Sequence, residues 1–168
     1  MKIAIVYKSF SGNTKIVAEA IREALKDHNV IYFGEPEHAA DADLYIIGSW
    51  TDKGMCAKEI SGFVQKLRGK KIAYFGTAGF GGSEEYYRTL YQRVCALIDG
   101  SNELPGYFFC QGKMPMGVRD RYVKMLQEHP EDKKLQVSIE NFDQALSHPD
   151  EKDLSDAKAW ITDLISRL

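Results

Sequence analysis

Hydroxyl and amide side chains surround a single glycine in the segment from Ser9 to Thr14, whose sequence is Ser-Phe-Ser-Gly-Asn-Thr. The segment joins a short apolar run to a stretch with helical periodicity, so we expect it to open a helix. The start of a helix presents unpaired N–H groups and the positive end of the helix dipole. Because neutral side-chain donors are added here, the segment is predicted to bind an anion, and a terminal phosphate monoester suits it.

Gly12 lies at the centre of this segment, and its missing Cβ allows a positive φ or a close approach of the ligand. The spacing excludes two other phosphate loops, since neither a Walker ending of Gly-Lys-Ser/Thr nor a Gly-x-Gly-x-x-Gly turn is present. A helix start capped by Ser11 or Asn13, with no ligand at all, is the alternative interpretation of the segment.

Two further loops combine an aromatic residue with glycines and backbone amides. They are Ser-Trp-Thr-Asp-Lys-Gly at residues 49–54 and Thr-Ala-Gly-Phe-Gly-Gly at residues 77–82. Such loops suit a flat heteroaromatic ring, although Trp50 alone is compatible with a packing role and Phe80 with an exposed loop residue. Together with the phosphate-type segment, the loops indicate a mononucleotide-like ligand.

The elements that would position these loops follow from the apolar pattern. Five short runs, most of them continuously apolar, are expected to form buried parallel strands at residues 2–7, 29–33, 44–48, 71–76 and 107–111. Amphipathic helical stripes separate them, and a last stripe covers residues 154–165. This alternation predicts a doubly wound α/β sandwich of three layers, in which ligands bind at the carboxyl ends of the strands.

Residues 114–151 interrupt that alternation before the last helix. Their pattern predicts a helix at about 118–127, a polar break at 129–132 and a further amphipathic piece near 139–146. We interpret them as a helical insertion that forms either a lid or partner surface, or simply a helical cap on the domain.

Composition sets the broad class. With 168 residues, 44% hydrophobic and 27% charged, the chain is expected to form a single domain over residues 1–168. Three separated cysteines without a Cys-x-x-Cys pair favour the cytoplasm, and four scattered histidines give no metal-site spacing. A net charge of −2 without a basic block predicts no nucleic-acid binding, and no apolar stretch approaches the ~20 residues of a membrane span.

The chain resembles the flavodoxin family, whose phosphate loop Thr/Ser-x-Thr/Ser-Gly-Asn-Thr is matched at residues 9–14. The resemblance continues through the strand ends at 46–49 and 75–77 and covers residues 1 to about 112. It implies a five-stranded parallel sheet of order 2-1-3-4-5 and bound FMN. By this resemblance the phosphate would contact Ser9, Phe10, Ser11, Gly12, Asn13 and Thr14, and the isoalloxazine would contact Ser49, Trp50, Thr51, Asp52, Lys53, Gly54, Thr77, Ala78, Gly79, Phe80 and Gly81.

The function that this resemblance implies is electron transfer with a redox partner protein, by a monomer that needs no catalytic side chain. The chain departs from the family in its near-neutral charge and in Phe80, which replaces the usual tyrosine. The charge favours an alternative, an FMN-dependent oxidoreductase acting on a quinone, a tetrapyrrole or NAD(P)H, and a cofactor-free binding module is a third possibility. The Trp-Thr-Asp-Lys-Gly and Gly-Thr-Ala-Gly loops are similar to those of flavodoxin-like proteins from anaerobes linked to bile-pigment reduction.

Two hypotheses concern the flavin itself. The Gly54 carbonyl, or a neighbouring peptide of the 51–54 turn, would accept a hydrogen bond from N5 of the reduced ring. Lys53 or Lys8 would lie near the pyrimidine side and raise the midpoint potential, with a solvated surface lysine as the alternative.

Overall fold

Five parallel strands form the central sheet of the computed structural model, which describes residues 1–168. They are β1 (Ile3–Lys8), β2 (Val30–Gly34), β3 (Leu44–Asp52), β5 (Lys71–Ala78) and β6 (Glu103–Gln111). Their spatial order is β2-β1-β3-β5-β6, and a sixth, two-residue strand, β4 (Met55–Cys56), pairs antiparallel with the end of β3. The predicted doubly wound parallel sheet and its order are therefore confirmed.

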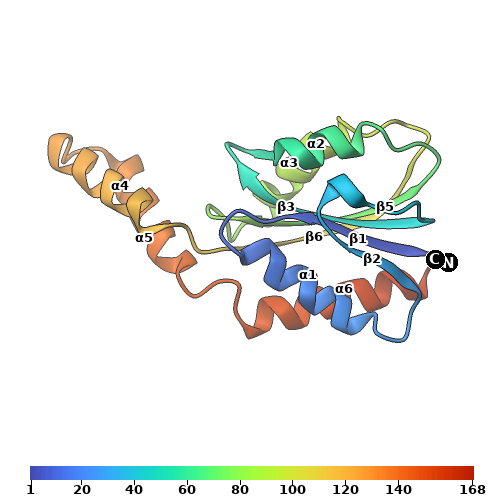
Figure 1. The fold of residues 1–168 in the computed structure, drawn as a ribbon. Helices are drawn as coiled ribbons and strands as arrows, with labels where there is room; N and C mark the ends of the chain where they lie inside the picture. Colours follow the sequence, from blue (N-terminus) through green and yellow to red (C-terminus); the bar gives the residue numbers. More distant parts are fainter.

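Helices cover both faces of this sheet and make it the middle of three layers (Figure 1). Helices α1 (Asn13–Ala24) and α6 (Glu151–Ser166) lie on one face, and α2 (Lys58–Val64) and α3 (Glu84–Cys95) lie on the other. A short 3-10 helix, η1 (Pro36–His38), follows β2. Two separate apolar clusters lie between the sheet and the helices, one on each face. Because the central strands are buried on both faces, their sequences are almost continuously apolar.

The centre of the sheet has no room for a side chain at Gly48 of β3. The buried ring of Phe75, on the neighbouring strand β5, lies over this glycine. A Cβ atom built on Gly48 would be 2.0 Å from Cζ of that ring. The glycine that precedes the 49–54 loop is thus required for the packing of β3 against β5.

Residues 114–147, which we call the arm, form a helical hairpin that projects beyond the carboxyl edge of the sheet (Figure 1). It consists of α4 (Met116–Glu128) and α5 (Lys133–Ala145). Its two ends meet, because the Lys113 amide donates a hydrogen bond of 2.9 Å to the carbonyl of His148. None of the helices in the chain has the length and apolarity needed to cross a bilayer.

The two helices of the arm are longer than the sequence pattern predicts. Helix α5 begins at Lys133 rather than near residue 139, because the Asp132 carboxylate accepts hydrogen bonds from the amides of Lys134 and Leu135 and caps the helix. Its next turns are polar and exposed on one side, so their helical periodicity is weak.

Candidate functional site

A cavity of about 490 Å³ lies at the carboxyl ends of the strands, where the three predicted loops meet. Its volume is within the range of small-molecule and cofactor sites. Most of the predicted residues line it: Phe10, Ser11, Asn13, Trp50, Thr51, Asp52, Lys53, Gly54, Thr77, Ala78, Gly79 and Phe80.

The start of α1 is open toward a ligand. Gly12 precedes the helix with φ +97°, and no side chain caps the helix in the manner of an N-cap. The Ser9 hydroxyl accepts hydrogen bonds from the amides of Gly12 and Lys15, at 3.1 and 3.3 Å, and so shapes the turn from within. The amides of Asn13 and Thr14 have no acceptor in the chain. Free amides at the positive end of a helix form an anion site.

Asn13 is the polar residue most committed to this site. It is 8% exposed, and its Nδ2 donates to the Lys113 carbonyl at 2.9 Å and to the Ser11 hydroxyl at 3.3 Å. Its Oδ1 is buried and has no hydrogen-bond partner. An unmatched buried acceptor costs about 1–3 kcal/mol, which a ligand with hydroxyl donors beside its phosphate would recover.

Thr14 and Ser49, which do not line the cavity, support its loops together with Thr77, which does. The buried hydroxyls of Thr14 and Thr77 are 2.9 Å apart and link the first loop to β5. The Ser49 hydroxyl donates to the Trp50 carbonyl at 2.7 Å and accepts from the Ala57 amide at 2.8 Å, which ties the end of β3 to the start of α2. The first bond therefore joins the first loop to the third, and the other two fix the second loop against the start of α2.

Two aromatic pairs line the cavity. Phe10 stacks on Trp50, with ring centroids 4.9 Å apart, and Phe80 meets Tyr86 edge to face at 5.6 Å. Phe10 and Phe80 are 69% and 49% exposed, which is unusual for such large apolar rings. Burial raises the pKa of Tyr86 above its ordinary value, so its phenol stays neutral. The walls therefore suit a flat, largely apolar ring.

The 49–54 loop is a tight hairpin turn held from outside. Lys53 and Gly54 both have positive φ, 48° and 81°, and connect β3 to β4. The Gly54 carbonyl, the hypothesised acceptor for flavin N5, accepts a hydrogen bond of 3.0 Å from Arg93 of α3. Lys53 lines the cavity, whereas Lys8 is paired with Glu35 at 2.7 Å and does not line it.

The 77–82 loop is held by two buried amides that sequence reasoning missed. Gln111 at the end of β6 and Asn141 of α5 are each 8% exposed and hydrogen-bond to one another at 3.1 Å. Both also donate to the Gly79 carbonyl, at 3.1 and 3.0 Å, and the Gly81 amide donates to Asn141 Oδ1 at 3.4 Å. The arm thus supports the loop that carries Phe80.

The arm also supplies a wall of the cavity, which the loop motifs did not predict. The only sequence signal for it is the run Lys113-Met-Pro-Met, which follows the last strand at the carboxyl edge. Beyond the predicted loops, the cavity is lined by Tyr86, Gly112, Lys113, Met114, Pro115, Val118, Arg121 and Tyr122.

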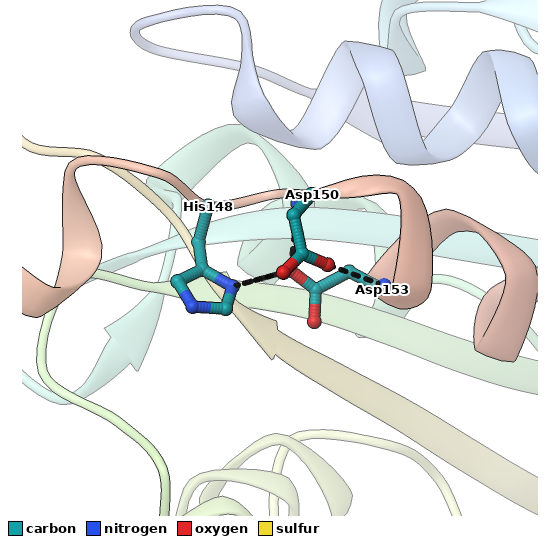
Figure 2. A group of neighbouring side chains, drawn as sticks. All are labelled: His148, Asp150 and Asp153. Carbon is teal, nitrogen blue, oxygen red and sulfur yellow. Dashed lines mark hydrogen bonds and ion pairs between the residues drawn. The ribbon is translucent and has the colours of Figure 1, made fainter.

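A second group of functional side chains lies where the arm returns to the body (Figure 2). His148, Asp150 and Asp153 have ligand atoms within 4.8 Å of one another. The Asp150 carboxylate accepts from the Asp153 amide, Asp153 accepts from the Asp150 amide, and His148 Nδ1 lies 2.6 Å from Asp153 Oδ2. This is a capping box that begins α6, and its hydrogen bond from the Asp153 amide holds the pKa of Asp150 below its ordinary value. His148 is therefore engaged with Asp153.

A parallel sheet of this order, with an open helix start and two aromatic loops at one edge, defines a flavodoxin-type protein. The family model for the flavodoxin domain matches residues 4–162, and the chain belongs to that family. A curated relative, the flavodoxin-like domain-containing protein BilS of Clostridium symbiosum, is 36% identical over 174 residues and covers 92% of this chain and 91% of its own. BilS of Clostridioides difficile is 28% identical over 172 residues, and the match covers 98% of this chain and 97% of the relative.

Solved structures agree on the fold. Oxidised flavodoxin 2 from Bacillus cereus matches with a TM-score of 0.59 at 21% identity, and the match covers 100% of both chains. A flavodoxin from Streptococcus pneumonia TIGR4 gives 0.60 at 15% identity, again over 100% of both chains.

Proposed function

We propose that this chain is an FMN-binding electron-transfer protein of the cytoplasm that exchanges one or two electrons with a partner redox enzyme. The observation that carries the proposal is the open start of α1, where the amides of Asn13 and Thr14 are free and Asn13 lines a cavity walled by two aromatic pairs. Membership of the flavodoxin family, which generally binds FMN, supports it.

The chain's own residues then bind and orient the cofactor. The amides of Asn13 and Thr14 would hold the phosphate, and Asn13 Oδ1 would accept a hydrogen bond from a ribityl hydroxyl. Trp50 and Phe80, with the rings that pack on them, would exclude water from the isoalloxazine. When bound, FMN supplies the electron chemistry, so the protein needs no acid or base for the transfer itself.

A second candidate function, an FMN-dependent oxidoreductase acting on a quinone, a tetrapyrrole or NAD(P)H, is favoured by one observation. Val118, Arg121 and Tyr122 of the arm extend the lining of the cavity beyond the three loops. Such an added wall would give a small substrate a place beside the ring.

Cofactor binding is tested by titrating the apoprotein into FMN and into riboflavin while following flavin fluorescence. Because the phosphate is expected to bind the free amides of α1, FMN should bind at least about a hundredfold more tightly, equivalent to ~2.7 kcal/mol. Equal affinity for the two flavins would contradict the proposed phosphate site.

The two candidate functions are separated by anaerobic titration of the FMN-loaded protein. Dithionite reduction in two one-electron steps, with no reaction toward NADH or NADPH, supports the carrier. Direct two-electron bleaching by either nicotinamide supports the oxidoreductase instead.

A further inference from the structure

One side of helix α4 has no partner in the molecule. None of its residues is buried, whereas α5 buries Leu135, Asn141, Phe142 and Ala145. The side of α4 that faces the cavity carries Val118, Arg121 and Tyr122, and Met125 follows one turn further on with 47% of its surface exposed. The arm projects beyond the sheet (Figure 1), and α5 is the one helix or strand against which α4 packs extensively.

The charges around this side are also uncompensated. Lys53, Lys113 and Arg121 line the cavity, with Asp52 as the single acidic residue among the lining side chains. None of these four takes part in an ion pair. The acidic residues of α4, Asp120 and Glu128, do not line the cavity.

A neighbouring arginine shows the contrast. Arg119, on the other side of α4, makes a two-pronged pair with Asp143 of α5, at 2.7 and 3.1 Å. The cation that faces α5 is therefore neutralised inside the arm, while those that face the cavity stay free. With Lys53, Lys113 and Arg121 against Asp52, the residues that line the mouth thus carry a net charge of +2 in a chain whose net charge is −2.

We propose that the cavity-facing side of α4, together with Lys53 and Lys113, is a docking surface for an acidic patch on the redox partner protein. Aromatic, methionine and arginine side chains are the residue types enriched in protein interfaces, and free cations select a partner of opposite charge. The proposal rests on the proposed function, because it names the chemistry of the partner for the same site. Electrons would pass at the mouth of the cavity, where this surface brings the partner.

The surface is tested first without FMN, so that failure of cofactor binding does not affect the result. Deca-glutamate and deca-lysine are added separately to the ¹⁵N-labelled protein, and amide shifts are followed by NMR. We expect deca-glutamate, and not deca-lysine, to shift the amides of Lys53, Lys113 and residues 118–125. Shifts spread evenly over all exposed lysines, or a larger response to deca-lysine, would overturn the proposal.

The second test uses the FMN-loaded, reduced protein and two small oxidants, anionic hexacyanoferrate(III) and cationic hexaammineruthenium(III). Raising the ionic strength from about 10 to about 100 mM shortens the Debye length from ~30 to ~10 Å. The rate with the anion should fall roughly three- to tenfold over that range, whereas the rate with the cation should not fall. A rate with the anion that stays constant or rises would refute the free positive mouth.

Matched charge variants locate the effect. Lys53→Glu with Arg121→Glu should abolish or reverse the salt dependence with the anion and remove the deca-glutamate shifts. Lys133→Glu with Lys134→Glu makes the same change of charge at the tip of the arm and should leave the salt dependence and the deca-glutamate shifts unchanged. FMN affinity is measured for each variant. Equal effects of the two pairs, or a dimer through this face in sedimentation, would contradict a partner-specific surface.

Discussion

Replacing Asn141 by alanine should loosen the loop that carries Phe80, although Asn141 lies on the arm. The substitution removes the donation to the Gly79 carbonyl at 3.0 Å and the acceptance from Gln111 at 3.1 Å, with a weaker contact from Gly81 at 3.4 Å. A buried hydrogen bond contributes about 0.5–1.5 kcal/mol net, so two full bonds and one marginal bond give a loss of roughly 2–3 kcal/mol in the free energy of unfolding.

Urea unfolding measures the loss in the free energy of unfolding of the whole domain. Amide hydrogen exchange at Gly81 measures the loosening of the 77–82 loop. The matched control is Gln144→Ala, an exposed position on the same helix, which should change stability by less than about 0.5 kcal/mol. A double-mutant cycle with Gln111→Ala should return a coupling of about 1 kcal/mol, because the two amides share a bond and an acceptor. FMN affinity should fall about three- to tenfold, as the Phe80 wall is no longer held.

Two results would contradict this role of Asn141. If Asn141→Ala unfolds within about 0.5 kcal/mol of the parent protein, the amide network does not support the loop. If stability falls while Gly81 exchange and FMN affinity stay unchanged, Asn141 holds the arm to the body without organising the candidate site.

Three further outcomes are expected. Gly12→Ala forces a residue with a Cβ to φ +97°, so it should lower the free energy of unfolding by about 1–2 kcal/mol and weaken FMN binding in the fluorescence titration. The control Gly62→Ala, in the middle of α2 with open space around it, should be neutral or stabilising. Gly48→Ala would place Cβ 2.0 Å from the Phe75 ring and should lower stability in urea by roughly 1–3 kcal/mol or more. Because the pKa of Asp150 is below its ordinary 3.8, its stabilisation is complete above that pH and is lost as the pH falls below it; Asp150→Asn should flatten this part of the acid unfolding curve.

The sheet could be predicted because burial on both faces leaves a local mark on each strand. The run that begins at Lys71 gave β5 directly, and only its last two residues were missed, since Thr77 and Ala78 are held extended by pairing with β6. Strand β4 could not be predicted, because two residues carry no periodicity and exist as a strand only through pairing with Thr51 and Asp52.

In the candidate site too, the residues that form a local pattern could be predicted, and those that the fold brings together could not. The three loops were predictable, since each combines its donors, glycines and aromatic residue within six consecutive positions. Arg121 and Tyr122 reach the cavity only through the direction in which the arm leaves β6, which no local pattern encodes. Asn141 likewise resembles any polar residue on a helix surface until the fold places Gln111 beside it.

Because the Lys113 amide is hydrogen-bonded to the His148 carbonyl, the chain leaves the domain and returns to it at the same place. Because the two ends of the segment lie side by side, its length adds little to the closure entropy that the rest of the chain must overcome in folding. The sheet and its four flanking helices can therefore keep one architecture while the segment between these two residues is lengthened, shortened or exchanged. The connectivity of the arm is thus separable from that of the sheet, whereas its contacts are not, because Asn141 of the arm donates to the Gly79 carbonyl in the wall of the candidate site.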